Sequence, residues 1–258
     1  MTNEEKKVIK LIALDMDGTL LNSNGEIPEE NRKAIKEAQD AGIHVVLSTG
    51  RSIATCKDHA ESLFLKTYLV TVNGSEIWDW QGNLIERNLV EAEQMRWLWE
   101  LAQKHGAKTW AISCDKLWNN EMPEDIDSLE WLKFGYHIDD DAIRNEVLNE
   151  LQARNIFEIS NSSLVNIEVN ALGINKARGL KTVCERLGIT MDEVMAAGDS
   201  LNDISMIKEA AIGVAMGNAQ EVVKETADVT TKTNDENGVA YAIRKWALKT
   251  EQEPVLKK

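Results

Sequence analysis

The sequence predicts an α/β protein: a Rossmann-like, doubly wound parallel-sheet core that carries an inserted α+β cap domain. Its 258 residues exceed the usual size of one domain. Apolar strands alternate with amphipathic helices near both ends of the chain, which is typical of a parallel sheet. Between them, residues 87–170 hold 16 acidic and only 8 basic side chains, and the alternation is lost. We therefore expect a core made of residues 1–86 and 171–258, with residues 87–170 as the insert.

The first part of the predicted core is a βαβ unit followed by a third strand and a hairpin. An apolar, β-branched run at residues 8–14 suits a strand buried on both faces. A helix between Pro28 and Gly42 leads to a second strand at residues 43–47, through a crossover expected to be right-handed. The remaining elements are a strand at residues 68–72 and a hairpin of residues 76–80 and 83–88.

The same patterns predict the insert and the second part of the core. In the insert we expect helices at residues 91–105 and 139–154 and strands at residues 108–113, 157–161 and 165–169. The core resumes with helices at residues 175–187, 202–210, 219–225 and 238–249 and strands at residues 194–197 and 212–214. Seven of the eight tryptophans lie between Trp78 and Trp131, inclusive. Most of them are expected to pack inside the insert, and one or two near Cys114 and Trp118 are candidates for stacking on a substrate ring.

Composition excludes several classes of protein. The net charge of −14 disfavours nucleic acid and anionic membranes as general partners, so a bound phosphate needs local cations. The cysteines Cys56, Cys114 and Cys184 are scattered and odd in number, which indicates neither a disulfide framework nor a zinc cluster. The N-terminal residues lack the form expected of a signal peptide, and the sequence contains no apolar run of about 18 residues. We expect a soluble cytoplasmic protein, either a monomer or a homodimer.

The strongest functional signal is the segment Asp15-Met16-Asp17-Gly18-Thr19-Leu20, directly after the first strand. Residues two positions apart in an extended segment point the same way, so both carboxylates can face one substrate. The carboxyl ends of strands are also where open α/β sheets bind ligands. The alternatives are an Asx turn or part of a calcium loop, but the later ligands of an EF-hand do not match. Paired carboxylates at a buried strand end favour a functional site.

Two further strand ends carry polar segments. Ser48-Thr49-Gly50-Arg51 offers a hydroxyl and a backbone N–H to a phosphoryl oxygen, while Arg51 contacts either the substrate or an acid of the core. In Gly198-Asp199-Ser200-Leu201-Asn202-Asp203, Asp199 can ligate a hard cation. Ordinary helix N-caps are the alternative for Ser48, Thr49, Asp199 and Ser200, and an isolated Lys176 would usually be a surface charge. Their combination in chain order favours one phosphate site.

This combination resembles the haloacid dehalogenase-like hydrolase superfamily, and within it the Cof-type (subclass IIB) sugar phosphatases. The resemblance also rests on Asn73-Gly74, on Gly173 to Lys176, on Met206 and on Gly213 to Ala219, and it spans nearly the whole chain. Asn175 before Lys176 and Ala177-Arg178 after it depart from the residues that the family often has there. The placement of the insert after the second motif matches the large cap of this branch.

The resemblance implies a phosphatase in which Asp15 attacks phosphorus and becomes an aspartyl phosphate, while Asp17 serves as acid and then as base. Mg²⁺ is the implied cofactor, held by the Asp15 and Asp199 carboxylates and the Asp17 backbone carbonyl, with Asp203 supporting. The implied phosphate ligands are the Met16 N–H, Thr49, Gly50, Lys176 and Asn202. The expected substrate is a small phosphate monoester, such as a sugar phosphate.

Two other functions stay open at the level of sequence. One is a phosphosugar mutase or phosphotransferase, and the other is a non-catalytic regulator that binds phosphate. The Asp15 and Asp17 pair disfavours the regulator, because a binding protein has no need of two costly neighbouring acids. The motifs do not identify the physiological ester, because in this branch the cap selects it.

Overall fold

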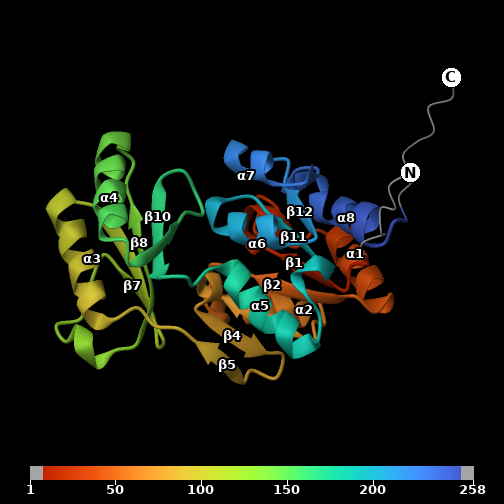
Figure 1. Ribbon diagram of the computed structural model, residues 1–258, viewed down its shortest axis with the longest axis horizontal. Coiled ribbons are helices and arrows are strands. Elements are labelled where there is room, and N and C mark those ends of the chain that lie inside the picture. Colours follow the sequence, from red (N-terminus) through yellow and green to blue (C-terminus); the bar gives the residue numbers. More distant parts are fainter. Residues whose placement is uncertain (1–7, 251–258) are drawn as a thin grey trace.

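The computed structural model describes residues 8–250, which form two sheets with their helices (Figure 1). The larger sheet has eight strands in the order β13-β12-β11-β1-β2-β3-β4-β5 within this range. Six of them are parallel, and β4 and β5 form the expected antiparallel hairpin. In chain order the strands are β1 (Leu11–Leu14), β2 (His44–Ser48), β3 (Tyr68–Thr71), β4 (Glu76–Asp79), β5 (Leu84–Arg87), β11 (Val194–Gly198), β12 (Ile212–Ala215) and β13 (Val229–Thr230).

Helices cover both faces of this sheet, which confirms the doubly wound α/β core. Alternate residues of β1 enter different apolar clusters: Ile12 and Leu14 belong to one, and Leu11 and Ala13 to the other. The first cluster includes residues of α1 (Glu29–Asp40), α2 (Ile53–Ser62), α7 (Glu221–Thr226) and α8 (Gly238–Ala242). The second includes residues of α5 (Lys176–Leu187), and α6 (Ile204–Glu209) contributes to both.

Strands are added on one side of β1 in the first part of the core (β2, β3) and on its other side in the second part (β11, β12, β13). This change of side positions the site. β1 pairs in parallel with β2 on one side and with β11 on the other, so Leu14 is in register with both Leu47 and Ala197. After β1 the chain runs to α1, which belongs to the first cluster, whereas after β11 it runs to α6, which packs against α5 of the second cluster. A crevice therefore opens beyond the strand ends at this point, as in other open α/β sheets.

The smaller sheet has the order β7-β6-β8-β10-β9, and we call this sheet with its two helices the cap. Helices α3 (Ala92–His105) and α4 (Asp141–Arg154) cover its outer face, while the other face looks toward the larger sheet (Figure 1). Its strands are β6 (Lys108–Ser113), β7 (Leu117–Asn119), β8 (Trp131–His137), β9 (Phe157–Ser160) and β10 (Asn166–Ala171). The chain enters the cap after β5 and returns after β10. That residues 87–170 are a separate specificity domain stays a prediction.

Several elements differ from the sequence expectations. The first strand begins at Leu11 rather than at residue 8, and the C-terminal helix is a short α8 continued by a π-helical turn, Ile243–Ala247. The strands β7, β8 and β13 and the helix α2 were not expected at all. In α2 only Cys56 and Ala60 are buried, so it lacks a recognisable apolar stripe. None of the helices within residues 8–250 is both long enough and apolar enough to cross a membrane.

Candidate active site

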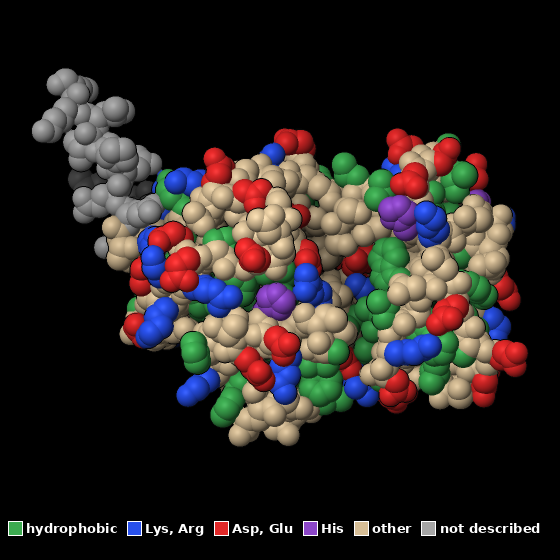
Figure 2. Space-filling view, turned by 180° about the vertical axis from the view of Figure 1, so that it is seen from behind, with side chains coloured by type: hydrophobic (Ala, Val, Ile, Leu, Met, Phe, Trp, Pro, Cys, Tyr) green, Lys and Arg blue, Asp and Glu red, His purple; other side chains and the backbone are tan. Residues whose placement is uncertain are grey.

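The polar segments predicted from sequence meet at the carboxyl ends of three adjacent strands. Asp15 follows β1, Thr49 and Gly50 follow β2, and Asp199 follows β11. Asp15 and Gly50 border a cavity of about 250 Å³ between the larger sheet and the cap, where the surface is hollowed (Figure 2). The cavity is lined by Asp15, Asp17, Gly50, Arg51, Trp110, Lys133, Ser162, Glu168, Ser200 and Asn202.

Lys176 is the buried cation of this site. It begins α5, its side chain has no exposed surface, and its Nζ donates hydrogen bonds of 2.6 Å to Asp15 Oδ1 and of 2.6 Å to Asp203 Oδ1. Burial alone would lower the pKa of Lys176, but the charges of Asp15 and Asp203 outweigh it and raise that pKa. Lys176 is therefore a permanent positive charge beside Asp15, unlike the surface charge typical of an isolated lysine.

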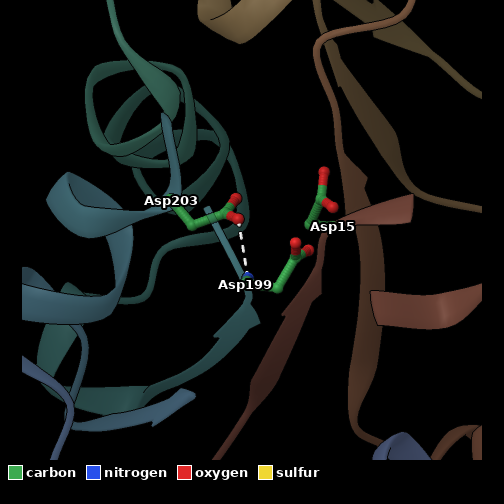
Figure 3. A group of neighbouring side chains, drawn as sticks. All are labelled: Asp15, Asp199 and Asp203. Atoms are coloured by element: carbon green, nitrogen blue, oxygen red, sulfur yellow. Dashed lines mark hydrogen bonds between the residues drawn. The ribbon is translucent and has the colours of Figure 1, made fainter. Parts of the chain in front are cut away.

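Three carboxylates converge at this site (Figure 3), and two of them accept the Lys176 hydrogen bonds. One oxygen each from Asp15, Asp199 and Asp203 lies within 4.8 Å of the others. Asp199 accepts hydrogen bonds from Thr19 Oγ1 and Ser200 Oγ, both of 2.9 Å. Asp203 accepts the backbone N–H groups of Asp199 at 2.9 Å and Ser200 at 3.0 Å, which fixes the loop after β11. Side chains and backbone thus hold the carboxylates together against their mutual repulsion.

The carboxylates fit a hard divalent cation. Burial, together with the charges of neighbouring acids, raises the pKa of Asp15 well above its usual range and that of Asp199 to about 6. Three carboxylates against one ammonium leave two negative charges uncompensated. Mg²⁺ prefers oxygen ligands, and its two positive charges would compensate these two negative charges. The expected ligand set used Asp17 through its backbone carbonyl, whereas the third carboxylate that the fold brings to this cluster is that of Asp203.

Glycine at position 18 allows the segment after β1 to approach Asp199. Gly18 has a positive φ of 79°, a backbone conformation that residues with a side chain rarely adopt. A Cβ atom there would lie 2.7 Å from Asp199 Oδ2, inside van der Waals contact. A residue with a side chain at position 18 would push this segment away from Asp199.

Asp17 lines the same cavity as Asp15, but its carboxylate faces Arg51. Arg51 donates from Nη2 to Asp17 Oδ1 at 2.6 Å and from Nε to Asp17 Oδ2 at 2.8 Å, a bidentate pair. Asp17 is exposed, its side chain retaining 58% of its accessible surface. Of the two roles considered for Arg51, the structure shows the pairing with an acid of the core.

The other expected phosphate ligands differ in which of their polar groups already have a hydrogen-bond partner. The Thr49 N–H donates to Val70 O within the sheet, and the Thr49 hydroxyl oxygen accepts the Arg51 N–H at 3.1 Å, so the hydroxyl hydrogen is what Thr49 can offer to a ligand. Asn202 donates from Nδ2 to Asn73 Oδ1 at 3.2 Å, while its buried Oδ1 has no partner. Gly50 lines the cavity itself, and a Cβ there would meet Asn73 Oδ1 at 3.1 Å.

Sequence reasoning missed four residues of the cap that line the cavity: Trp110, Lys133, Ser162 and Glu168. Lys133 donates to Gly50 O at 2.9 Å and to Glu168 Oε2 at 3.3 Å, and both side chains are nearly fully buried. Burial alone would raise the pKa of Glu168, but the charge of Lys133 and hydrogen bonds from Asn73 and Ser162 hold it below its usual value. The sequence signal that could have identified Lys133 is its position as a charged residue within the mostly apolar segment Trp131–His137.

Comparisons with known proteins agree with this geometry. Residues 12–147 and 119–243 match the family pattern of the haloacid dehalogenase-like hydrolases. The 5-amino-6-(5-phospho-D-ribitylamino)uracil phosphatase YcsE of Bacillus subtilis is 60% identical over 240 residues, which cover 93% of this chain and 96% of that protein. A second B. subtilis phosphatase named for the same ester, YwtE, is 30% identical over 280 residues, covering 91% of this chain and 97% of that protein.

Solved structures show the same arrangement of core and cap. A haloacid dehalogenase-like hydrolase from B. subtilis superposes with a TM-score of 0.84 at 26% identity, over 92% of this chain and 99% of that one. A subclass IIB sugar phosphatase superposes with a TM-score of 0.80 at 25% identity, over 93% of this chain and 99% of that one. The subclass of the second structure is the one that the sequence motifs resemble.

Proposed function

Because the chain belongs to the haloacid dehalogenase-like hydrolases, we propose that it is the phosphatase of one particular ester, 5-amino-6-(5-phospho-D-ribitylamino)uracil. Hydrolysis of a small phosphate monoester is the activity that the family match and the 60% identical phosphatase show. The choice of ester is supported by two relatives named for it, both of which align over more than nine tenths of this chain. The expected setting is the cytoplasm.

Asp15 is the proposed nucleophile, and its contact with Lys176 is the observation that carries the mechanism. One Asp15 oxygen accepts the Lys176 hydrogen bond of 2.6 Å, which leaves the other for attack on phosphorus. The new bond joins that oxygen to phosphorus, and the bond from phosphorus to the ribityl oxygen breaks. Water then attacks the aspartyl phosphate and releases inorganic phosphate. Lys176 favours the ionised, nucleophilic form of Asp15 in a buried site that otherwise raises its pKa.

Asp17 is the proposed acid and base. It gives a proton to the departing ribityl oxygen and later removes one from the attacking water. Its carboxylate now pairs with Arg51 and is exposed, so it has to leave Arg51 to reach the leaving oxygen. This change needs only rotation of the Asp17 side chain, because Asp15 and Asp17 already border one cavity.

Asp15 and Asp199 are the proposed carboxylate ligands of Mg²⁺, together with the Asp17 backbone carbonyl. Bound there, Mg²⁺ supplies positive charge that offsets repulsion between the phosphate dianion and the acids. Asp203 supports the site by holding Lys176 and the loop after β11. The Met16 N–H, the Thr49 hydroxyl, Gly50, Lys176 and Asn202 are the proposed donors to the phosphate oxygens.

Phosphate release from the purified protein tests this proposal. With Mg²⁺, the parent is expected to hydrolyse 5-amino-6-(5-phospho-D-ribitylamino)uracil in preference to hexose phosphates. Asp15→Asn is expected to lower kcat by about 1000-fold or more, since an amide cannot form the covalent intermediate. Asp192→Asn, an exposed acid away from the cavity, serves as the matched control. Preference for a hexose phosphate would refute the substrate, and normal turnover by a folded Asp15→Asn protein would refute the nucleophile.

A further inference from the structure

One face of the cap sheet presents a row of three residues toward the larger sheet. Gly135 of β8 lies opposite Trp110 of β6 on one side and opposite Glu168 of β10 on the other. Cross-strand partners share a face of a sheet, so these three side-chain positions point the same way. The neighbouring positions pack against α3 and α4 on the other face: Ala111, Phe134, Tyr136, Ile167 and Val169. The row is therefore not part of the cap core.

The missing side chain of Gly135 makes room for the indole ring of Trp110. A Cβ atom at Gly135 would lie 2.1 Å from Trp110 Cε2 and 2.3 Å from Cζ2, so the ring rests directly on the β8 backbone. Trp110 also packs at the edge of a small apolar cluster formed by Val72, Ile112 and Leu132. Backbone and cluster together fix the orientation of the ring.

Trp110 differs from the other tryptophans of the cap in what it faces. It is half-buried and lines the cavity that contains Asp15 and Asp17. By contrast, Trp97, Trp99, Trp118 and Trp131 belong to the apolar cluster beneath the helices of the cap. Among the described cap residues, Trp110 is thus the aromatic side chain that a ligand in this cavity would meet.

Polar groups connect the phosphate end of the cavity with Trp110. Lys133 reaches from the cap to the Gly50 carbonyl, next to the proposed phosphate donors, and it also pairs with Glu168. Glu168 in turn shares the Gly135 row with Trp110. A substrate that enters with its phosphate at Asp15 therefore meets charged hydrogen-bonding groups and then an aromatic surface. This order matches a phosphate ester with a hydroxylated chain and a planar ring at its far end.

We propose that Trp110 is a specificity-determining residue that stacks on a planar heteroaromatic ring in the leaving group of the substrate. The inference rests on the proposed function for the identity of that ring, a substituted uracil. Stacking of a nucleobase on an aromatic side chain strengthens binding by about tenfold or more and tolerates different rings. A ring-free sugar phosphate gains nothing from it. Trp110 thus selects among phosphate esters without touching the reacting atoms.

A pair of substrates that differ only in the ring tests this inference. These are 5-amino-6-(5-phospho-D-ribitylamino)uracil and D-ribitol 5-phosphate, and kcat/KM is measured for each by phosphate release. Trp110→Ala is expected to lower kcat/KM for the uracil compound about 10- to 100-fold, mostly through KM, and that for ribitol phosphate about twofold or less. Trp110→Phe should restore most of the loss, because a phenyl ring also stacks.

Two further variants separate stacking from packing. Gly135→Ala keeps the tryptophan but places a methyl group where the ring lies, so it should give the same substrate-selective loss. Trp99→Ala removes a half-buried tryptophan of the cap core and should leave the ratio between the two substrates unchanged. Equal losses on both substrates in Trp110→Ala would mean that Trp110 only packs, and the inference would be wrong.

The same measurements distinguish failure of this inference from failure of the proposed substrate. If the parent hydrolyses ribitol phosphate but not the uracil compound, the proposed substrate is wrong. Flavin mononucleotide, whose planar ring also lies at the end of a ribityl phosphate, then serves as the ring-bearing ester, with the same expected loss in Trp110→Ala. Equal turnover of every ring-bearing ester by the parent and by Trp110→Ala would overturn the stacking role, whichever ester is physiological.

Discussion

At the scale of single residues, the site depends on buried charges that only partly compensate one another. Lys176 satisfies one oxygen of Asp15 and one of Asp203, and backbone N–H groups satisfy the other oxygen of Asp203. Asp199 receives only hydroxyl hydrogen bonds, from Thr19 and Ser200. It is therefore a carboxylate whose charge has no direct cationic partner within the described residues, and its ionisation should depend most on a bound metal.

Removal of the metal is accordingly expected to make stability fall with rising pH. The pKa of Asp199 is raised to about 6 in the folded protein, mainly by burial and then by the charge of Asp203. A group whose pKa is higher folded than unfolded contributes stability that is present below the unfolded pKa of about 4 and is lost as pH rises through the folded value. In EDTA, the free energy of unfolding should drop on the order of 2 kcal/mol between about pH 4 and pH 7.

Urea unfolding followed by circular dichroism measures this effect with and without Mg²⁺. Mg²⁺ should remove most of the decline, because it binds the ionised carboxylates of the folded state. Asp199→Asn, which does not titrate, should show a flatter profile in EDTA and a weaker response to Mg²⁺. The same pH profile in all four samples would contradict a cation site at Asp199.

At the scale of elements, the sequence predicted the core well because buried parallel strands are continuous apolar runs. Each motif-bearing strand of the core, β1, β2 and β11, was expected within three residues of its observed ends. The motifs could be placed together because parallel strands present their carboxyl ends at one edge. Asp15 and Asp199 were anticipated for this reason and Lys176 through the family resemblance, although their distances and hydrogen bonds required the structure.

The central strand of the cap, β8, shows why the rest could not be predicted. Its sequence Trp131-Leu-Lys-Phe-Gly-Tyr-His137 contains a lysine and a glycine, both of which are poor strand residues. The structure gives a reason for each: Lys133 reaches the Gly50 carbonyl, and Gly135 accommodates the Trp110 ring. Contacts with distant residues thus override strand propensity in β8. Gly50 and Trp110, which Lys133 and Gly135 contact, are distant in sequence, so no local pattern reveals these contacts.

The ion pair between β8 and β10 leads to a prediction about stability. Glu168→Gln should lower the free energy of unfolding at neutral pH by about 3 kcal/mol, since it leaves Lys133 buried without its counter-charge. The pKa of Glu168 is lower folded than unfolded, so its contribution is present above the unfolded value of about 4.3 and is lost as pH falls through the folded one. The difference between parent and variant should therefore shrink in acid.

Denaturant unfolding at neutral and acidic pH checks this, with Glu130→Gln as the control. Glu130 also pairs with an arginine, Arg87, but its side chain is 60% exposed, so its loss should cost well under 1 kcal/mol. An equal, small effect of both substitutions would show that the buried pair contributes nothing special. A loss that does not depend on pH would indicate a packing defect instead.

At the scale of the whole molecule, a chain with a net charge of −14 has to bind an anion. Local cations offset this negative charge at the site: Arg51, Lys133 and Lys176 lie where the core meets the cap. Two of these cations belong to the core and one to the cap, so the positive field is complete only when the cap rests on the core. Around the cavity the two parts are joined by hydrogen bonds, among them Lys133 to Gly50, Asn73 to Glu168 and Ser200 to Ser162. Water can replace such bonds, and we expect the cap to open for substrate entry.

Trp110 is placed to report this opening. Its ring lies at the boundary between cap and core and is already half-buried there, while the tryptophans of the cap core should keep their surroundings when the cap moves as a unit. Addition of Mg²⁺ with orthovanadate, a phosphate mimic, should favour the closed form and shift the intrinsic emission to shorter wavelength, because closure removes water from the indole. Trp110→Phe should abolish most of this shift and Trp99→Phe should retain it. A shift of equal size in Trp110→Phe would contradict this role of Trp110. No shift in the parent, together with unchanged small-angle scattering, would indicate a rigid cap, because the surroundings of a residue between cap and core must change when the cap moves.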